Sequence, residues 1–231
     1  MKILIPPSEG KSNINPSDVL FGDTKFKFQK EVEQVVKLLG LINNEVLGSV
    51  YGTTEKKALG YHMQNQDIFK SRCAPAIERY SGVVYENIDW LSMTDSEKNY
   101  MEKHVCIFSG LFGLLTPKTM IPNYKLKMNV LSLQNHWNKI ITKELEKENL
   151  IFDLLPQVHR KAYTKNNNVI NIDFLVVNKG KKKAAGHFGK SVKGKFIRFL
   201  AQNNIKKLDE FHQFEYDGFK WDNNAFIKTI N

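Results

Sequence analysis

The 231-residue chain has only two cysteines, Cys73 and Cys106, and neither belongs to a CxxC pair. So few thiols exclude a disulfide-stabilised scaffold and favour a protein of the reducing cytoplasm. No apolar run approaches the ~18 residues that a membrane-spanning helix requires, so we expect no membrane segment. The apolar run at residues 2–5 is too short for a signal peptide, and it predicts a first strand instead.

Patterns that bind metals or nucleotides are also missing. The six histidines show no HExxH or HxxxH spacing, and no ExxH motif suggests a ferritin-like iron site. There is no GxSxG elbow. Gly10-Lys11-Ser12 resembles the end of a phosphate-binding loop, but Ile5 stands where that loop needs its first glycine. We therefore predict no metal site and no cofactor.

What the chain does contain is enough apolar sequence for one substantial core. Hydrophobic residues make up 42% of it, and no linker-like composition divides it. The pattern predicts one α/β domain over residues 1–231, with a central mixed sheet flanked by helices. Predicted strands are residues 2–5, 105–108, 151–155 and 169–177. Predicted helices include residues 26–39, 94–104, 133–145 and 190–200, with Thr94 and Glu97 as a capping box.

Two turn signals predict local hairpins. Gly52, Thr53 and Thr54 separate two short helices, the second with Ala58, Leu59 and His62 facing inward. Such a pair either presents backbone N–H groups to a phosphate, as helix-hairpin-helix elements do, or forms an ordinary αα-hairpin. Near the C-terminus, Asp217-Gly218 between residues 214–216 and 219–221 predicts a β-hairpin.

The stretch at residues 105–128 is the predicted centre of the protein. Ser109 follows a wholly apolar run and therefore sits at the carboxyl end of a buried strand, where open α/β sheets bind ligands. Gly110 and Gly113 allow a tight turn and close backbone approach, because neither has a Cβ. Three lysines follow beside that edge, at positions 118, 125 and 127. Their alternative role is that of solvated loop residues.

The formal charge of +10 is unevenly distributed. Between residues 160 and 207, thirteen lysines and arginines stand against one acid, Asp173, which gives this segment +12. Such a concentration indicates a face that binds a polyanion; the alternative is a lysine-rich solubilising surface. The candidate phosphate-binding residues are Lys11, Arg79, Lys118, Lys125, Lys127, Lys181, Lys182, Lys183, Lys190, Lys193, Lys195 and Arg198.

Polar residues at predicted strand ends suggest a second class of function. Ser8 and Glu9 follow the first strand, Ser109 ends the central one, and Glu78 lies in a largely apolar segment. These side chains supply an acid, a base and hydroxyls, the groups that a nucleotide- or base-processing enzyme needs. Arg79 either faces the crevice and grips a phosphate, or pairs with Glu78 or Glu86 in a structural role.

Four segments together resemble the YaaA family of peroxide-stress proteins. They are Pro-Pro-Ser-Glu-Gly-Lys at 6–11, Pro-Ala-Ile-Glu-Arg-Tyr-Ser-Gly-Val-Val-Tyr at 75–85, Ser-Gly-Leu-Phe-Gly-Leu-Leu at 109–115, and Ile-Pro-Asn-Tyr-Lys-Leu-Lys-Met at 121–128. The resemblance implies a single α/β domain with a positively charged cleft and a helix-hairpin-helix element, which would lie at about residues 43–65. It further implies a cytoplasmic, DNA-binding protein that responds to hydrogen peroxide and limits free iron.

Two hypotheses follow. The favoured one is a non-enzymatic protein of iron homeostasis and oxidative-stress defence that binds duplex or distorted DNA through a basic cleft with low sequence specificity, as a monomer. The alternative is an enzyme of glycosidic-bond chemistry that uses Ser8, Glu9, Glu78, Arg79 and Ser109.

Overall fold

The structure is a computed structural model that describes residues 1–230. Its main sheet has the strand order β4-β3-β1-β6-β7. The strands are β1 (Lys2–Ile5), β3 (Val105–Ser109), β4 (Gly113–Leu115), β6 (Ile151–Asp153) and β7 (Val169–Asn171). β3, β1, β6 and β7 run parallel, while β4 returns antiparallel to β3. β1 and β3 are wholly apolar apart from Lys2 and Ser109, as expected for strands covered on both faces.

A second sheet has the order β10-β11-β8-β9. Its strands are β8 (Asp173–Asn178), β9 (Lys181–Ala184), β10 (Lys220–Asp222) and β11 (Ala225–Ile230). Helix α9 (Gly186–Gln202) packs on this sheet through Phe196, whose ring centroid lies 4.6 Å from that of Phe226 and 4.8 Å from that of Phe211. These contacts fix the position of the lysines on α9. β2 (Ala74–Pro75) and β5 (Met120–Ile121) form a separate antiparallel pair.

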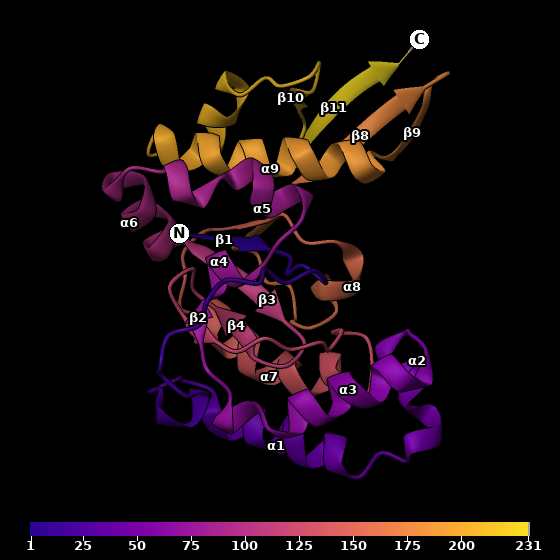
Figure 1. The fold of residues 1–231 in the computed structure, drawn as a ribbon. Coiled ribbons are helices and arrows are strands. Elements are labelled where there is room, and N and C mark those ends of the chain that lie inside the picture. Colours follow the sequence, from indigo (N-terminus) through magenta and orange to yellow (C-terminus); the bar gives the residue numbers. More distant parts are fainter. Residues whose placement is uncertain (231) are drawn as a thin grey trace.

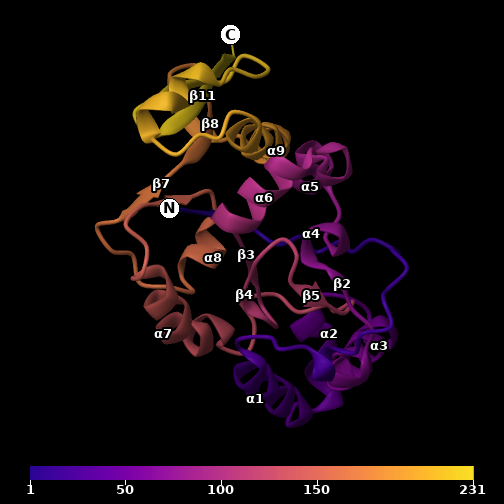
Figure 2. The same ribbon diagram turned by 90° about the vertical axis from the view of Figure 1, so that its left-hand side faces the viewer.

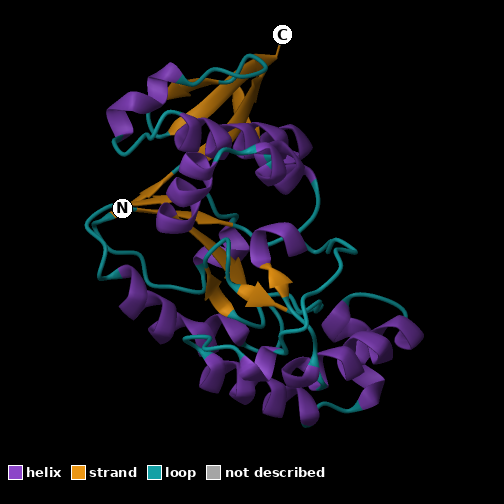
Figure 3. Ribbon diagram, turned by 60° about the vertical axis from the view of Figure 1, so that its left-hand side comes forward, coloured by secondary structure: helices purple, strands orange, loops and turns teal. Residues whose placement is uncertain are grey.

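Helices lie on both sides of the main sheet. In Figure 1, α5 and α9 lie above β1, whereas α1, α3 and α7 lie below β3; Figure 2 shows the same grouping from the side, and Figure 3 shows strands between the two groups. The helices before α9 are α1 (Gln29–Gly40), α2 (Leu47–Tyr51), α3 (Glu55–Gln66), α4 (Ala76–Arg79), α5 (Val83–Ile88), α6 (Asp95–His104), α7 (Leu133–Leu145) and α8 (Gln157–Arg160). The predicted mixed α/β domain, with a sheet flanked by helices, is confirmed.

Several local predictions are confirmed. The strand at 2–5 and the helix at 133–145 have the predicted bounds, and Thr94 and Glu97 form the capping box at the start of α6. The glycines of the central stretch are also explained. A Cβ on Gly113, whose φ is +70°, would meet the Trp137 ring at 2.5 Å, and one on Gly110 would meet the Leu126 carbonyl oxygen at 2.6 Å. The contact at Gly110 holds the segment around Leu126 against the end of β3.

The single strand predicted at 169–177 is wrong, because the chain changes sheets there. Val169, Ile172 and Phe174 are buried, so the spacing of three between the first two breaks the period of two that one strand requires. β7 ends at Asn171 in the main sheet, and β8 begins at Asp173 in the second.

Two further predictions need correction. The predicted turn at Asp217-Gly218 is present, with φ of +50° and +73°, but the segments beside it pair through one bridge, between Tyr216 and Phe219. A longer hairpin joins β10 and β11 through Asn223 and Asn224. Both asparagines have positive φ, of 44° and 66°, which fits the primed turns of two-residue hairpins. On α3, Ala58 is buried as predicted, but Leu59 is 43% exposed.

A matched pair of substitutions tests the packing of α9 on α5. A Cβ on buried Gly194 would meet the Val84 carbonyl oxygen at 2.4 Å, so Gly194→Ala is expected to lower the free energy of unfolding by ~1–3 kcal/mol. Gly60→Ala is the control, because Gly60 lies exposed inside α3 with open space around it. It should raise that free energy by ~0.4–1 kcal/mol. Urea unfolding measures both, and equal shifts of the same sign would contradict the packing.

Candidate functional site

A cavity of about 740 Å³ opens beyond the carboxyl ends of β1 and β6. The chain runs from β1 to β3 on one side of β1, and from β6 to β7 on the other, so the strand order reverses between β1 and β6. Open α/β sheets bind ligands at such switch points. The walls come from segments after β1 and β6, from residues 124–129, and from the start of α9. The fold therefore brings together regions far apart in sequence.

Lys11 is partly buried in the cavity wall. Its Nζ donates hydrogen bonds to the carbonyl oxygens of Ser8, at 2.7 Å, and Glu9, at 3.4 Å. It also lies 4.5 Å from the ring centroid of Tyr124 and 5.0 Å from that of Tyr80. Burial, with the nearby charge of Lys125 as a smaller cause, lowers the pKa of Lys11 to about 7. Near neutral pH the Lys11 side chain therefore populates both the ammonium form and the free amine.

Buried hydroxyls hold the aromatic support of Lys11 in place. The Tyr124 hydroxyl lies 2.6 Å from that of Tyr80 and 2.8 Å from that of Ser109. Ser109 also accepts a hydrogen bond from the backbone N–H of Phe112 at 3.0 Å. Ser109 lies at the end of β3 as predicted, but it is fully buried beneath Tyr124 and does not line the cavity. Its contacts position Tyr124.

Glu9 bridges two lysines at the edge of the cavity. Its carboxylate lies 2.9 Å from the Lys125 Nζ and 3.1 Å from the Lys127 Nζ. The hydrogen bond from Lys125 is the largest cause that lowers the pKa of Glu9. A single carboxylate thus faces two ammonium groups, which leaves this edge with excess positive charge.

A buried ion-pair network shapes the opposite wall. The Asp153 carboxylate accepts hydrogen bonds from Arg160 Nε at 3.0 Å and from the Tyr163 hydroxyl at 2.6 Å. It also accepts one from the backbone N–H of Leu155, at 2.7 Å. A second contact of Arg160, 3.0 Å from Asp173, ties β8 to the same network. These bonds fix the segment that follows β6.

Two titratable groups lie on that wall. Lys193 donates to the Leu154 carbonyl, and burial lowers its pKa to about 8. Burial likewise lowers the pKa of His159 to about 4, and its Nδ1 is buried with no hydrogen-bond partner among the described residues. His159 is therefore neutral at pH 7. His159 was not among the residues predicted from the sequence, although it follows a predicted strand end.

The structure gathers some predicted phosphate-binding residues and separates others. Those that line the cavity are Lys11, Lys125, Lys127, Lys190 and Lys193. Lys181, Lys182 and Lys183 are exposed on β9, and Lys195 lies on α9 outside the cavity lining.

The two predicted arginines have structural partners. Arg198 pairs with the Asp89 carboxylate at 3.3 Å and donates to the Ile88 carbonyl at 3.0 Å. Arg79 is 4% exposed and donates to the Ser12 carbonyl at 3.3 Å, so neither predicted pairing, with Glu78 or Glu86, is formed.

The residues of the enzyme hypothesis are divided in the same way. Ser8 and Glu9 line the cavity, whereas Glu78 accepts a hydrogen bond from the Trp90 indole at 3.2 Å and lies outside the lining. Ser109 is buried beneath Tyr124 and does not line the cavity. The cavity therefore presents Ser8 and Glu9 of this set, together with amines and an imidazole.

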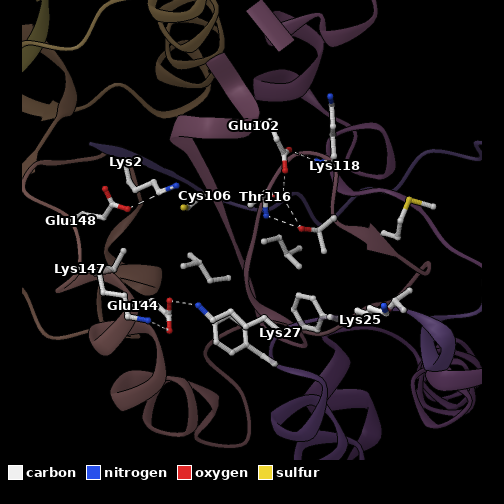
Figure 4. A pocket seen from close by; sticks show the side chains of 18 residues that line it. Lys2, Lys25, Lys27, Glu102, Cys106, Thr116, Lys118, Glu144, Lys147 and Glu148 are labelled. Atoms are coloured by element: carbon white, nitrogen blue, oxygen red, sulfur yellow. Dashed lines mark hydrogen bonds and ion pairs between the residues drawn. The ribbon is translucent and has the colours of Figure 1, made fainter. Parts of the chain in front are cut away.

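A second cavity, of about 570 Å³, contains Lys118 and is shown in Figure 4. Three of its five lysines lie near carboxylates: Glu144 pairs with Lys147 at 2.8 Å and also with Lys27, and Glu148 lies 4.0 Å from Lys2. Glu102 accepts hydrogen bonds from the backbone N–H of Lys118 and the hydroxyl of Thr116. Five lysines and three glutamates line this cavity, whereas in the first cavity five lysines face only Glu9 and Asp173. The first cavity therefore has the larger excess of positive charge and is the better anion site.

The predicted αα-hairpin adjoins the first cavity. α2 and α3 are joined by Gly52, Thr53 and Thr54, and Gly52 adopts a left-handed conformation with φ of +62°. A Cβ on Gly52 would lie 3.5 Å from the Lys127 Nζ, so the turn lies against the lysine-lined edge.

Among residues 1–230, no group of His, Cys, Asp or Glu side chains is arranged to hold a metal ion. Within the same residues, no helix combines the length and apolar character needed to cross a membrane.

The acylation rate of Lys11 tests its unusual environment. Only the free amine reacts, so modification of the native protein should be half-maximal near pH 7 and nearly constant above pH ~8.5. In the urea-denatured protein the acylation rate of the same residue should instead keep rising about tenfold with each pH unit through this range, because an exposed lysine has a pKa of ~10.4. Peptide mass spectrometry at several pH values measures both. A native profile that follows the denatured one would contradict burial of the amine.

Comparison with known proteins identifies the family. The family model described as peroxide stress protein YaaA matches residues 1–225. Relatives include a UPF0246 protein of Streptococcus pneumoniae serotype 19F (strain G54), 28% identical over 230 residues, which cover 95% of this chain and 93% of the relative. The UPF0246 protein of S. pneumoniae strain CGSP14 is 29% identical over the same shares. The chain therefore belongs to the YaaA family of peroxide stress proteins.

Proposed function

We propose that this protein binds DNA with low sequence specificity through the lysine-lined cavity, and so protects it during peroxide stress. The convergence of lysines from three separate segments on one cavity carries this proposal. Lys11 follows β1, Lys125 and Lys127 follow β5, and Lys190 and Lys193 lie on α9. Ammonium groups that surround one opening favour a ligand with several negative charges, such as a sugar-phosphate backbone.

The αα-hairpin supports the same proposal. Its turn lies against Lys127, so backbone N–H groups at the start of α3 and the cavity lysines border the same edge. This arrangement is suited to phosphates of one strand, which N–H groups and lysines contact without reading bases. The predicted helix-hairpin-helix function of Gly52, Thr53 and Thr54 therefore belongs to this proposal.

The physiological setting belongs to the proposal as well. We place the protein in the cytoplasm, where it would act as a monomer and limit iron-driven damage to DNA. The family description, peroxide stress protein, supports the link to oxidative damage. The two cysteines of this protein, Cys73 and Cys106, are free and buried, which is compatible with a reducing compartment.

Fluorescence anisotropy with a labelled duplex tests DNA binding. The native protein should bind at 50 mM salt and weaken steeply towards ~200 mM, because phosphate contacts release counterions. The double variant Lys127→Gln/Lys190→Gln should bind several-fold more weakly. The slope of log affinity against log salt should also fall by about 1–2, since up to two phosphate contacts are lost.

The control removes the same charge elsewhere. Lys139 and Lys143 are exposed on α7 and do not line the cavity, so Lys139→Gln/Lys143→Gln should leave the salt slope unchanged. Absence of binding by the native protein at low salt would overturn the proposed function. Equal weakening by both double variants would overturn the assignment to this cavity.

A further inference from the structure

We propose that Lys11 captures a sugar aldehyde, such as the ring-opened deoxyribose of an abasic site in DNA, as a covalent imine. This inference rests on the proposed function, because it gives the DNA-binding cavity a specific lesion to recognise. It also adds a covalent step that charge attraction alone does not supply.

The position of Lys11 is the first argument. The cavity lysines differ in exposure: Lys190 is exposed, and the side chain of Lys127 is 39% exposed. Lys11 is partly buried against the rings of Tyr80 and Tyr124. Phosphates of an intact duplex can reach the exposed lysines, whereas contact with Lys11 requires a group that enters the cavity. A volume of about 740 Å³ is in the range that accommodates a nucleotide-sized group.

An abasic nucleotide is suited to that entry. It lacks a base, so extruding it from the duplex breaks no base pair and costs less than flipping an intact nucleotide. Its ring-opened form carries an aldehyde at C1′ between two phosphates. The exposed lysines would hold those phosphates, while the aldehyde reaches the inner amine.

The hydrogen bonds of Lys11 suit a nucleophile. A neutral amine has two hydrogens and one lone pair. The carbonyl oxygens of Ser8 and Glu9 offer one acceptor for each hydrogen, and no donor among the described residues binds the nitrogen. The lone pair is therefore free to react. An ordinary lysine is almost wholly protonated at pH 7, whereas burial gives Lys11 a substantial fraction of free amine.

Some charged groups around Lys11 lower its pKa, and others raise it. Lys125 and Arg79 favour the free amine, and Glu9 favours the ammonium form. The faces of Tyr80 and Tyr124 also favour the ammonium form. The balance provides both states near neutral pH, which imine chemistry uses: the free amine adds to the carbonyl, and a proton assists the loss of water.

The reaction is balanced without an oxidant, a reductant or a metal. The lone pair of Nζ adds to C1′, and the carbonyl electron pair moves to oxygen. The oxygen then leaves as water with the two amine hydrogens, and a C=N bond joins Nζ to C1′. Water reverses the step, so the complex is transient unless the imine is reduced.

Reductive trapping tests the inference. The protein is incubated with a duplex that contains one abasic site, and sodium cyanoborohydride is added. We expect a stable protein–DNA adduct, and peptide mass spectrometry should place it on Lys11. An adduct on Lys193, the other partly buried lysine with a lowered pKa, would overturn the assignment to Lys11. Absence of any adduct would overturn the proposal as a whole.

Variants separate nucleophile from charge. Lys11→Arg keeps a cation but offers no reactive amine, so it should yield no adduct even at a protein concentration that saturates the abasic duplex, as anisotropy measures. Lys11→Gln provides a second test if the arginine variant does not fold. Lys143→Gln, on the exposed face of α7, should retain the full yield. Undiminished trapping by a folded Lys11 variant would contradict the proposal.

A second substrate distinguishes the source of the aldehyde. Free deoxyribose 5-phosphate carries the same aldehyde and one phosphate. Trapping of abasic DNA at far lower concentration than the free sugar supports DNA as the substrate, whereas trapping of the free sugar alone overturns it. If an undamaged duplex binds but no aldehyde is trapped, the inference fails while the proposed function stands. If no DNA binds, the proposed function fails, and the free-sugar arm still reports on Lys11.

Discussion

The cavity depends on one electrostatic constraint: it holds five lysines but few carboxylates to compensate them. Glu9 is shared by Lys125 and Lys127, and Asp173 is occupied by Arg160. Burial and the field of Lys125 relieve part of the repulsion by making Lys11 easier to deprotonate. The free protein thus carries like charges close together, and an anionic ligand would offset them. The second cavity has three glutamates beside its five lysines, so its excess of positive charge is smaller.

The fold creates this constraint through strand order. β1 and β6 are parallel neighbours. The chain continues from β1 to β3 on one side and from β6 to β7 on the other, so the segments after both strands border one opening. Asp153 and Arg160 fix one wall, and the hydroxyls of Ser109 and Tyr124 fix the other. The phenylalanine cluster under α9 then brings Lys190 and Lys193 to the same opening. Stable packing around the site keeps its ammonium groups close together.

Sequence patterns predicted those elements whose local signals agree with the final packing. The apolar run of β3, the capping box at Thr94 and the periodicity of α7 are of this kind. The change of sheet at Ile172 and the late hairpin at Asn223 depend on tertiary pairing, which periodicity does not contain. The candidate site was likewise predicted in part. Charge counting found its lysines but also included Arg198, which pairs with Asp89, and Lys118, which the fold places in the second cavity. It missed His159, because burial rather than sequence makes that side chain unusual.

The most direct measurement of the central claim is a crystal structure of the protein bound to a short DNA duplex. The account predicts phosphate oxygens within hydrogen-bond distance of the Lys127 and Lys190 ammonium groups, with the αα-hairpin turn beside the same strand. A duplex bound elsewhere, for example over the second cavity or along α7, with no phosphate at these lysines, would contradict it.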